Sequence, residues 1–420
     1  MSEAHAILGF GRIASRREKV ARWESGTVVP DVQTQYAIAH LHKVAHQEVH
    51  RLGWPHWLHL GATDPELRAT PHVPDDAGVA LRHAWRDGRA SPGAYVSVTG
   101  QRLSTFVRSL CAQCPATPRW PQQGQFSWER TGYYVALVGS LEGLAPEVSP
   151  AALLPAARAD LGNLTMLLSC SALDREAKAE LAVLAARVAD LCGRLSMAVG
   201  RWVDAERYFL GAARAAATQG RASLVAGSLS NLAVCHMQVG EPRDGLLLVE
   251  TSSSLTGNRP SSVSALRSCR EAIGLARLGD EVGSARALER AADMISVQSE
   301  DEDVPTGMVV NEEWLSISSG IVWTDLGKPR KALVDFSPIL GPEIPAKPFR
   351  MPSWVVVQVV RAHLEAGEPE EAARHAGRAL SFFGGFSLLL AAQLRSEFTP
   401  FRSVPAVAAL LAELRAAVLS

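Results

Sequence analysis

Residues 181–220 read LAVLAARVADLCGRLSMAVGRWVDAERYFLGAARAAATQG. Apolar side chains recur there at intervals of three and four residues, the spacing that places them on one face of an α-helix. The pattern stops at Gly200, and a second helical pattern follows it. Small residues stand at Gly193 and Ala205, and the bulky Phe209 comes nine residues after the glycine. We therefore predict two paired α-helices joined by a tight turn, in which small residues allow close approach and the bulky one fills the groove toward the next pair.

The same set of positions recurs four more times toward the C-terminus. The turn residue is glycine each time, at spacings of 40, 39, 48 and 40 residues: Gly200, Gly240, Gly279, Gly327 and Gly367. The positions five and nine residues later are mostly small and mostly apolar, respectively: Ala205, Gly245, Ser284, Ala332 and Ala372, then Phe209, Val249, Leu288, Phe336 and Ala376. The position seven residues earlier is small in four cases of five: Gly193, Ala233, Ala272 and Gly320, with Val360 as the exception. Such recurrence predicts five stacked helical hairpins.

The recurring pattern resembles the tetratricopeptide repeat, with longer and degenerate linkers. The resemblance implies a right-handed solenoid of helical hairpins with a concave inner face, and a generic helical bundle is the alternative that the sequence leaves open. We divide the chain into an N-terminal unit (1–60), a helical connector (61–175) and a repeat domain (176–420). The seam between the first two is rich in Pro and Gly, reading GATDPELRATPHVPDD.

The composition agrees with an all-α globular protein. Apolar residues make up 47% of the 420 residues and charged ones 20%, and alternating strand patterns are almost absent. The net charge of -1 argues against a surface that is basic throughout, so any contact with DNA must be local. No stretch approaches the roughly 18 apolar residues of a membrane span, and we expect a cytoplasmic protein without membrane contact.

The segment SRREKVARWESG, residues 15–26, has the signals for one short helix. Ser15 followed by Glu18 forms a capping box, which satisfies free amide donors in the first turn. Gly26 can adopt the left-handed conformation that ends a helix. We predict a helix between these two caps.

This predicted helix has one apolar and one basic side. Val20 and Trp23 lie three residues apart and share a face that we expect to be buried. The remaining positions are mostly basic: Arg16, Arg17, Lys19 and Arg22. A helix with this distribution suits the DNA major groove, where arginine reads guanine by paired hydrogen bonds. A solvated surface helix is the alternative.

The segment VARWESGTVVP, followed by the helical AIAHLHKV, resembles the Cro/repressor-type (Xre) helix-turn-helix. Four residues match the family at the end of the recognition helix and in the loop after it: Trp23, Glu24, Gly26 and Pro30. The resemblance covers about residues 5–50. It implies base contacts from Arg17, Glu18 and Arg22, and phosphate contacts from Arg16 and Lys19. Glu18 has two candidate roles, helix cap and acceptor from cytosine, and we favour the cap.

The sequence departs from this family at its start. The family fold begins with a further helix of about a dozen residues, and here the chain starts inside the position of the second helix. We expect that the first helix is missing or trimmed. We call the predicted helix-turn-helix the reader. Trp54 and Trp57 follow it and predict a packing seam that joins the reader to the repeat domain. We favour this role over a surface on which bases stack.

Other residue clusters do not predict chemistry. Cys111 and Cys114 form a single CxxC without a second metal-binding pair, and the six cysteines are expected to be reduced. His46 and His50 lie four apart on a probable helix without a matching carboxylate motif, so ordinary packing is favoured over metal binding. Phosphate loops, nucleophile elbows and paired catalytic carboxylates are not evident. We expect no enzymatic activity, no catalytic residues, no metal and no cofactor.

Together these patterns predict a DNA-binding transcriptional regulator. The expected partners are double-stranded DNA, a second copy of the chain in a homodimer, and a peptide or small-molecule effector on the concave face of the repeats. Regulators that join an Xre reader to tetratricopeptide-like repeats, in particular those of the actinobacterial type, are what this chain resembles. The alternative from another class is a protein-interaction scaffold whose reader no longer binds DNA.

Overall fold

The computed structural model describes part of the chain. The described residues are 2–10, 23, 28–41, 44, 46, 49–50, 54, 57, 76–85, 96, 98–114, 131–145, 148–171, 173–256, 262–296, 311–340, 352–383 and 388–419. Within these ranges every regular element is a helix, so the predicted all-α class is confirmed. The helices before residue 175 are α1 (Ser2–Ile7), α3 (Val32–Leu41), α7 (Ala77–Trp85), α8 (Gly100–Gln113), α9 (Gly132–Leu144) and α10 (Pro150–Leu168).

After residue 175 the helices follow one another in pairs. The five pairs are α11 (Arg175–Ala198) with α12 (Trp202–Thr218), α13 (Ala222–Val239) with α14 (Pro242–Thr256), α15 (Ser262–Arg277) with α16 (Glu281–Ser296), α17 (Glu312–Asp325) with α18 (Pro329–Leu340), and α19 (Ser353–Glu365) with α20 (Pro369–Phe383). α21 (Leu388–Phe398), a short 3-10 turn (Thr399–Phe401) and α22 (Pro405–Leu419) complete the described chain. We refer to the five pairs as hairpins 1 to 5.

Each hairpin turns at a glycine that the sequence predicts, for two different physical reasons. Four of these glycines have a positive φ: Gly200 (76°), Gly279 (79°), Gly327 (68°) and Gly367 (82°). Gly240 instead has φ of -131°. There the Cγ2 atom of Val96 lies 2.6 Å from the position that a Cβ would occupy. Gly240 is therefore required for close approach of the connector, whereas the others are required for the backbone conformation of the turn.

Aromatic rings pack on glycines within hairpins 1 and 4. A Cβ at Gly193 would stand 2.5 Å from the ring of Phe209, and a Cβ at Gly320 would stand 2.5 Å from the ring of Phe336. Both rings are fully buried. Each ring fills the space that the glycine leaves in its own pair, because the helices lie too close for a larger side chain. The expected contact of the bulky residue with the next pair stays a prediction.

The first helices of successive hairpins lie beside one another. α11 contacts α13, α13 contacts α15, α15 contacts α17, and α17 contacts α19. Polar side chains that stand two residues before the turn glycine link α13, α15 and α17. The Nη2 of Arg277 on α15 donates to Gln238 on α13 (3.1 Å), and its Nε donates to Asp325 on α17 (2.8 Å). Asp325 also pairs with Arg361, at 3.5 Å, on α19. These links extend across hairpins 2 to 5. α11 also contacts α19, so the first helices of hairpins 1 and 5 touch.

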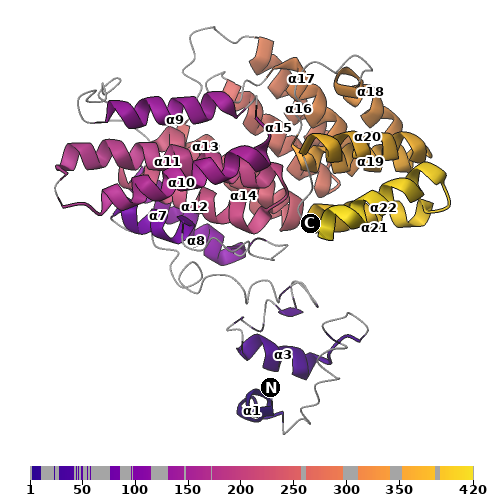
Figure 1. Cartoon of the computed structure of the whole chain (residues 1–420), viewed down its shortest axis with the longest axis horizontal. Helices are drawn as coiled ribbons and strands as arrows, with labels where there is room; N and C mark the ends of the chain where they lie inside the picture. The colour runs from indigo at the N-terminus through magenta and orange to yellow at the C-terminus, as the bar shows by residue number, and fades with distance from the viewer. Residues whose placement is uncertain are drawn as a thin grey trace.

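Four hydrophobic clusters organise the described residues, the smallest of them at Ala265 and Leu266 of α15. The largest contains residues of α7 to α19, so the connector helices share one core with the hairpins. A second contains residues of α19 to α22. The third belongs to the N-terminal unit alone. Figure 1 shows α1 and α3 at one end, apart from the body that α7 to α22 form.

The third cluster corrects the predicted packing seam. Trp57 is fully buried in it beside Trp23 and Ile38, and Trp54 packs against the same cluster. No described residue of the hairpins belongs to this cluster. The tryptophans therefore form the core of the N-terminal unit and do not join it to the repeats. A unit this small has few apolar residues of its own, so its largest side chains are used inside it.

The packing of Phe209 on Gly193 predicts opposite effects of alanine at two helical glycines. Gly193→Ala forces the ring of Phe209 to move, and we expect a loss of about 1–3 kcal/mol in the free energy of unfolding. Gly227→Ala on α13 meets no atom within 4 Å and should be neutral or stabilising by up to about 1 kcal/mol, because alanine favours a helix more than glycine does. Urea unfolding measures both. Equal effects of the two substitutions would contradict the predicted close contact.

Candidate functional site

The N-terminal unit is built around two tryptophans. Trp23 is helical and only 8% exposed, in agreement with the burial predicted for it. It packs with Ile38 and Ala39 of α3 and with the fully buried Trp57.

A chain of hydrogen bonds holds the loop before α3 in place. Asp31 caps α3 by accepting from the backbone N–H of Thr34 at 2.8 Å. The Nε2 of Gln35 donates to the carbonyl of the buried Pro30 at 2.8 Å. The Nε1 of Trp57 donates to the Oε1 of Gln35 at 3.2 Å. Gln35 therefore ties the loop at Pro30 to the tryptophan core, with both ends of its amide satisfied. Sequence reasoning did not single out Gln35, and a polar residue at a core position of α3 is the signal that could have found it.

The predicted DNA-contacting side chains lie outside the described residues. These are Arg16, Arg17, Glu18, Lys19 and Arg22. The predicted supporting residues Ser15, Val20, Glu24 and Gly26 lie outside them as well. Of the predicted reader residues, the structure therefore places Trp23 and Pro30 only, and both are buried in the N-terminal unit.

Two histidines of the N-terminal unit, His46 and His50, take part in aromatic packing. The ring of His46 stacks on that of Tyr36, with centroids 4.5 Å apart. His50 lies edge-on to the same ring at 5.4 Å and forms a hydrogen bond with its hydroxyl group. The ring of Phe10 also stacks on that of Tyr36, with centroids 6.3 Å apart. Among the described residues, no three His, Cys, Asp or Glu side chains lie together so that they could hold a metal ion.

The CxxC lies at the end of α8. All six cysteines are free, and Cys114 is buried while Cys111 is half-buried. Burial, together with the charge of Cys111, raises the pKa of the Cys114 thiol to about 11. Burial also raises the pKa of Cys111. Both thiols are therefore protonated at neutral pH, which makes them poor nucleophiles.

A buried polar relay crosses the first helices of hairpins 1 to 3. Asp190 on α11 accepts from Ser228 (2.9 Å) and from the Nδ2 of Asn231 (3.1 Å), both on α13. The Oδ1 of Asn231 in turn accepts from the Nη2 of Arg270 on α15, at 2.7 Å. Arg270 also donates to Ser230. Asn231 thus stands between a buried carboxylate and a buried guanidinium, and uses one end of its amide for each.

The relay contains an arginine in an unusual environment. Arg270 is 3% exposed, and burial lowers its pKa from 12.5 to about 10, although the charge of Asp190 acts in the opposite direction. Asp190 also pairs with Arg194 at 3.1 Å. Sequence reasoning missed this relay. Its signal is a polar residue nine or ten positions before the turn glycine in otherwise apolar helices, which holds for Asp190, Asn231 and Arg270.

Three buried polar atoms of α11 and α19 have no partner within the described structure. The Nη2 of Arg194 on α11 is buried and makes no hydrogen bond in the described structure. The same holds for the Nε1 of Trp354 and the Oε1 of Gln358, which lie one turn apart on α19. α11 and α19 contact each other. Buried polar groups in proteins are normally satisfied, so these two donors and one acceptor are candidate contacts for a bound water or ligand.

A pair of histidines couples α19 to α20. The rings of His363 and His375 stack with centroids 5.1 Å apart, and Glu368 lies 2.8 Å from the Nδ1 of His363. Burial lowers the pKa of His375 to about 4, and the charges of Arg374, His363 and Arg378 act in the same direction against the weaker effect of Glu371. His375 is therefore neutral in the folded protein at neutral pH.

Comparison with protein families, with curated proteins and with solved structures finds no match to this chain. Within the part of the chain that the structure describes, no helix combines the length and the apolar character needed to cross a membrane.

The relay predicts a large cost for removing its carboxylate. Asp190→Ala leaves Arg194 and Arg270 without a nearby negative charge, and we expect a loss of about 3–5 kcal/mol in the free energy of unfolding. In an Arg270→Met background the same substitution should cost less, because one of the two cations is gone. Urea unfolding of the four proteins of this cycle measures the coupling. The control is Glu271→Ala, in an exposed pair with Arg290 at 2.8 Å, which should cost no more than about 1 kcal/mol. Additive losses in the cycle would show that Asp190 and Arg270 do not interact.

The depressed pKa of His375 predicts a loss of stability in mild acid. The imidazole of the unfolded chain binds a proton as the pH falls through about 6.5, whereas in the folded protein it does so only near pH 4. Between these values the unfolded state binds more protons, so the free energy of unfolding falls as the pH falls. His375→Gln should flatten this slope in unfolding experiments between about pH 4 and 7. His40→Gln, at an exposed position of α3, is the control that should keep the slope; equal slopes in wild type and His375→Gln would refute the assignment.

Proposed function

We propose that this chain is a transcriptional regulator that binds double-stranded DNA through an N-terminal helix-turn-helix. Its tetratricopeptide-like hairpins form a homodimer and sense a peptide or small-molecule effector. The observation that carries the proposal is the core of the N-terminal unit, in which the motif residues Trp23 and Pro30 are both buried.

The proposed reading mechanism follows from the apolar and basic sides of the helix predicted over residues 15–26. Trp23 packs with Ile38 and Ala39 of α3. Arg17 and Arg22 contact base edges in the major groove, and Arg16 and Lys19 contact phosphates. Because the net charge of the chain is only -1, the attraction for DNA comes from this local basic segment and not from the whole surface. Two such readers in a two-fold dimer recognise a palindromic site.

The proposed sensing mechanism uses the first helices of the hairpins. The unsatisfied atoms of Arg194 on α11 and of Trp354 and Gln358 on α19 offer hydrogen bonds to a polar effector. These two helices contact each other. An effector can regulate DNA binding only if it binds one arrangement of the hairpins more tightly than another. Contact between the first and fifth hairpins supports this proposal, because a ligand between them would change how they are spaced.

Binding of duplex DNA of random sequence across a range of salt concentrations tests the proposal. Wild-type protein should bind with an affinity that falls as salt increases, because binding releases counterions from the phosphates. Arg17→Ala combined with Arg22→Ala should weaken binding at least about tenfold and reduce the salt dependence.

The matched control removes two other positive charges. Arg243→Ala combined with Arg286→Ala changes two exposed arginines of hairpins 2 and 3 and should leave the affinity unchanged. Thermal unfolding verifies that both double variants remain folded. If the Arg17 and Arg22 substitutions have no more effect than the control, the chain is a protein-interaction scaffold and not a DNA reader.

A further inference from the structure

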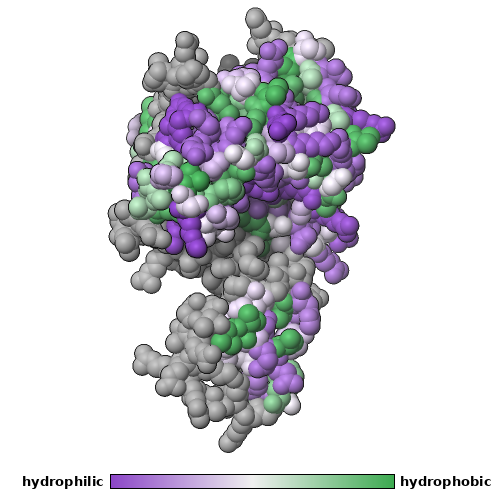
Figure 2. Space-filling model, turned by 90° about the vertical axis from the view of Figure 1, so that its right-hand side faces the viewer, coloured by the Kyte–Doolittle hydropathy of each residue, from purple (hydrophilic) through white to green (hydrophobic). Residues whose placement is uncertain are grey.

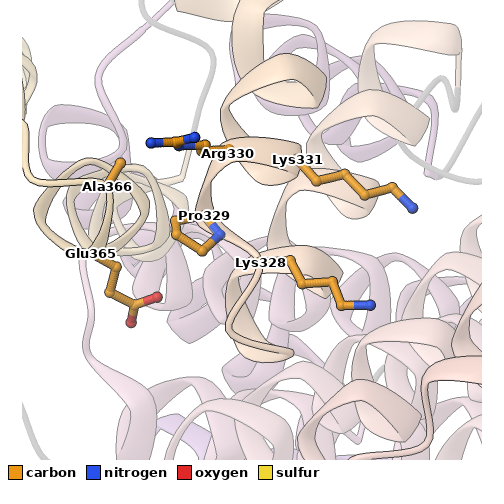
Figure 3. Close-up of a pocket in the computed structure, with 6 residues that line it drawn as sticks. All are labelled: Lys328, Pro329, Arg330, Lys331, Glu365 and Ala366. Atoms are coloured by element: carbon orange, nitrogen blue, oxygen red, sulfur yellow. The ribbon is translucent and has the colours of Figure 1, made fainter.

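The turns of hairpins 4 and 5 lie beside each other and border an open hollow. Its volume is about 410 Å³, and it is lined by Lys328, Pro329, Arg330, Lys331, Glu365 and Ala366. The basic residues come from the start of α18 and the other two from the end of α19 and the turn after it. In Figure 3 Arg330 points toward Ala366, whereas Lys328 and Lys331 point to the opposite side of α18.

The two lysines already have partners. Lys328 forms an ion pair with Glu281 of hairpin 3. The Nζ of Lys331 lies 3.3 Å from the centre of the Trp323 ring, a cation–π contact. Arg330 is exposed and has no ion pair or hydrogen bond within the described structure. It is therefore the uncompensated positive charge at the turn of hairpin 4.

Hairpin 5 carries an uncompensated negative charge at the equivalent place. Arg330 and Glu370 both stand three residues after their turn glycine, in the first turn of α18 and α20 respectively. Glu370 is exposed and, in the described part of the chain, has no ion pair. The acids around it are partnered, since Glu371 pairs with Arg374 and Glu368 with His363. Two neighbouring turns thus present one free charge of each sign.

One exposed apolar side chain adjoins Arg330. Val334 follows Arg330 by one helical turn and is 69% exposed. Figure 2 views the molecule from the side on which α18, α20 and α22 lie in Figure 1, and hydrophilic and hydrophobic surface are interleaved there. Apolar contacts with charges around them are typical of protein interfaces.

The arrangement of the charges selects the partner. A polyanion such as DNA or a lipid surface would be attracted to Arg330 but repelled by Glu365 in the same hollow and by Glu370, which follows Ala366 by four residues. A two-fold axis between the turns of hairpins 4 and 5 would instead place each free charge opposite its complement. In such a contact the same patch is used by both subunits.

We propose that this patch, comprising Arg330, Glu370 and Val334, is the surface through which two copies of the chain associate. Arg330 of one subunit lies against Glu370 of the partner subunit, and the reverse pair forms across the axis. The inference rests on the proposed function, which includes a homodimer, and adds the surface and the residues that form it.

Sedimentation equilibrium of the full chain, without DNA, tests this surface by charge reversal. Arg330→Glu creates two acid–acid contacts across the axis, and Glu370→Arg creates two base–base contacts. Each single variant should raise the dimer dissociation constant at least about tenfold. The chain that carries both substitutions should dimerise as wild type does, because the pairs are restored with exchanged positions.

A mixture of the two single variants provides the sharpest result. In a heterodimer of Arg330→Glu with Glu370→Arg, both contacts across the axis join opposite charges, so the mixture should form dimers that neither variant forms alone. Arg243→Glu is the control, because Arg243 stands at the equivalent position of hairpin 2 and is exposed. It should leave the dissociation constant unchanged.

Two results would overturn the proposed surface. One is a wild-type chain that remains monomeric at concentrations up to about 0.1 mM, because its dimer dissociation constant would then be too high for a specific dimer. The other is a dimer that is equally stable in the two single variants, which would place the interface elsewhere. Neither result depends on the reader, since no DNA is present. Failure of the proposed DNA-binding function would be seen in a different experiment. There the Arg17 and Arg22 substitutions would weaken DNA binding no more than their control does.

Discussion

The close approach of paired helices is the constraint on which the rest of the structure depends. In hairpins 1 and 4 a phenylalanine ring occupies the space that a glycine leaves on the facing helix. Because the ring would collide with any Cβ there, the two helices can pair in one register only. The register of each pair then determines which side chains of its first helix face the neighbouring hairpins. Lateral contacts between hairpins follow from contacts within them.

Polar links between hairpins add specificity to this apolar packing. Apolar side chains tolerate small sliding of one helix past another, whereas hydrogen bonds with defined donors and acceptors do not. The relay from Asp190 through Asn231 to Arg270 joins three hairpins, and Asp325 joins Arg277 to Arg361 across the next two. Burying these charges costs free energy, so their main contribution is to the order in which hairpins align and less to total stability.

The N-terminal unit and the repeats meet different physical requirements. The unit uses two buried tryptophans and one satisfied glutamine in a small core. The connector helices instead belong to the core of the hairpins, and Val96 of the connector packs on the turn at Gly240. Signals that change the spacing of the hairpins would therefore reach the connector directly.

The sequence alone determined where the helices lie and where each hairpin turns. Apolar periodicity and turn glycines specify both, because they are local properties of a chain segment. The burial of Trp23 was also predictable, as a consequence of helical spacing. Only the tertiary structure decided that Phe209 packs within its own hairpin, that Gly240 is needed for Val96, and that Asp190 reaches Arg270 through Asn231. These contacts join residues about 16 to 140 positions apart, and the angle and register at which helices meet decide them. Neither quantity is encoded in any short stretch of sequence.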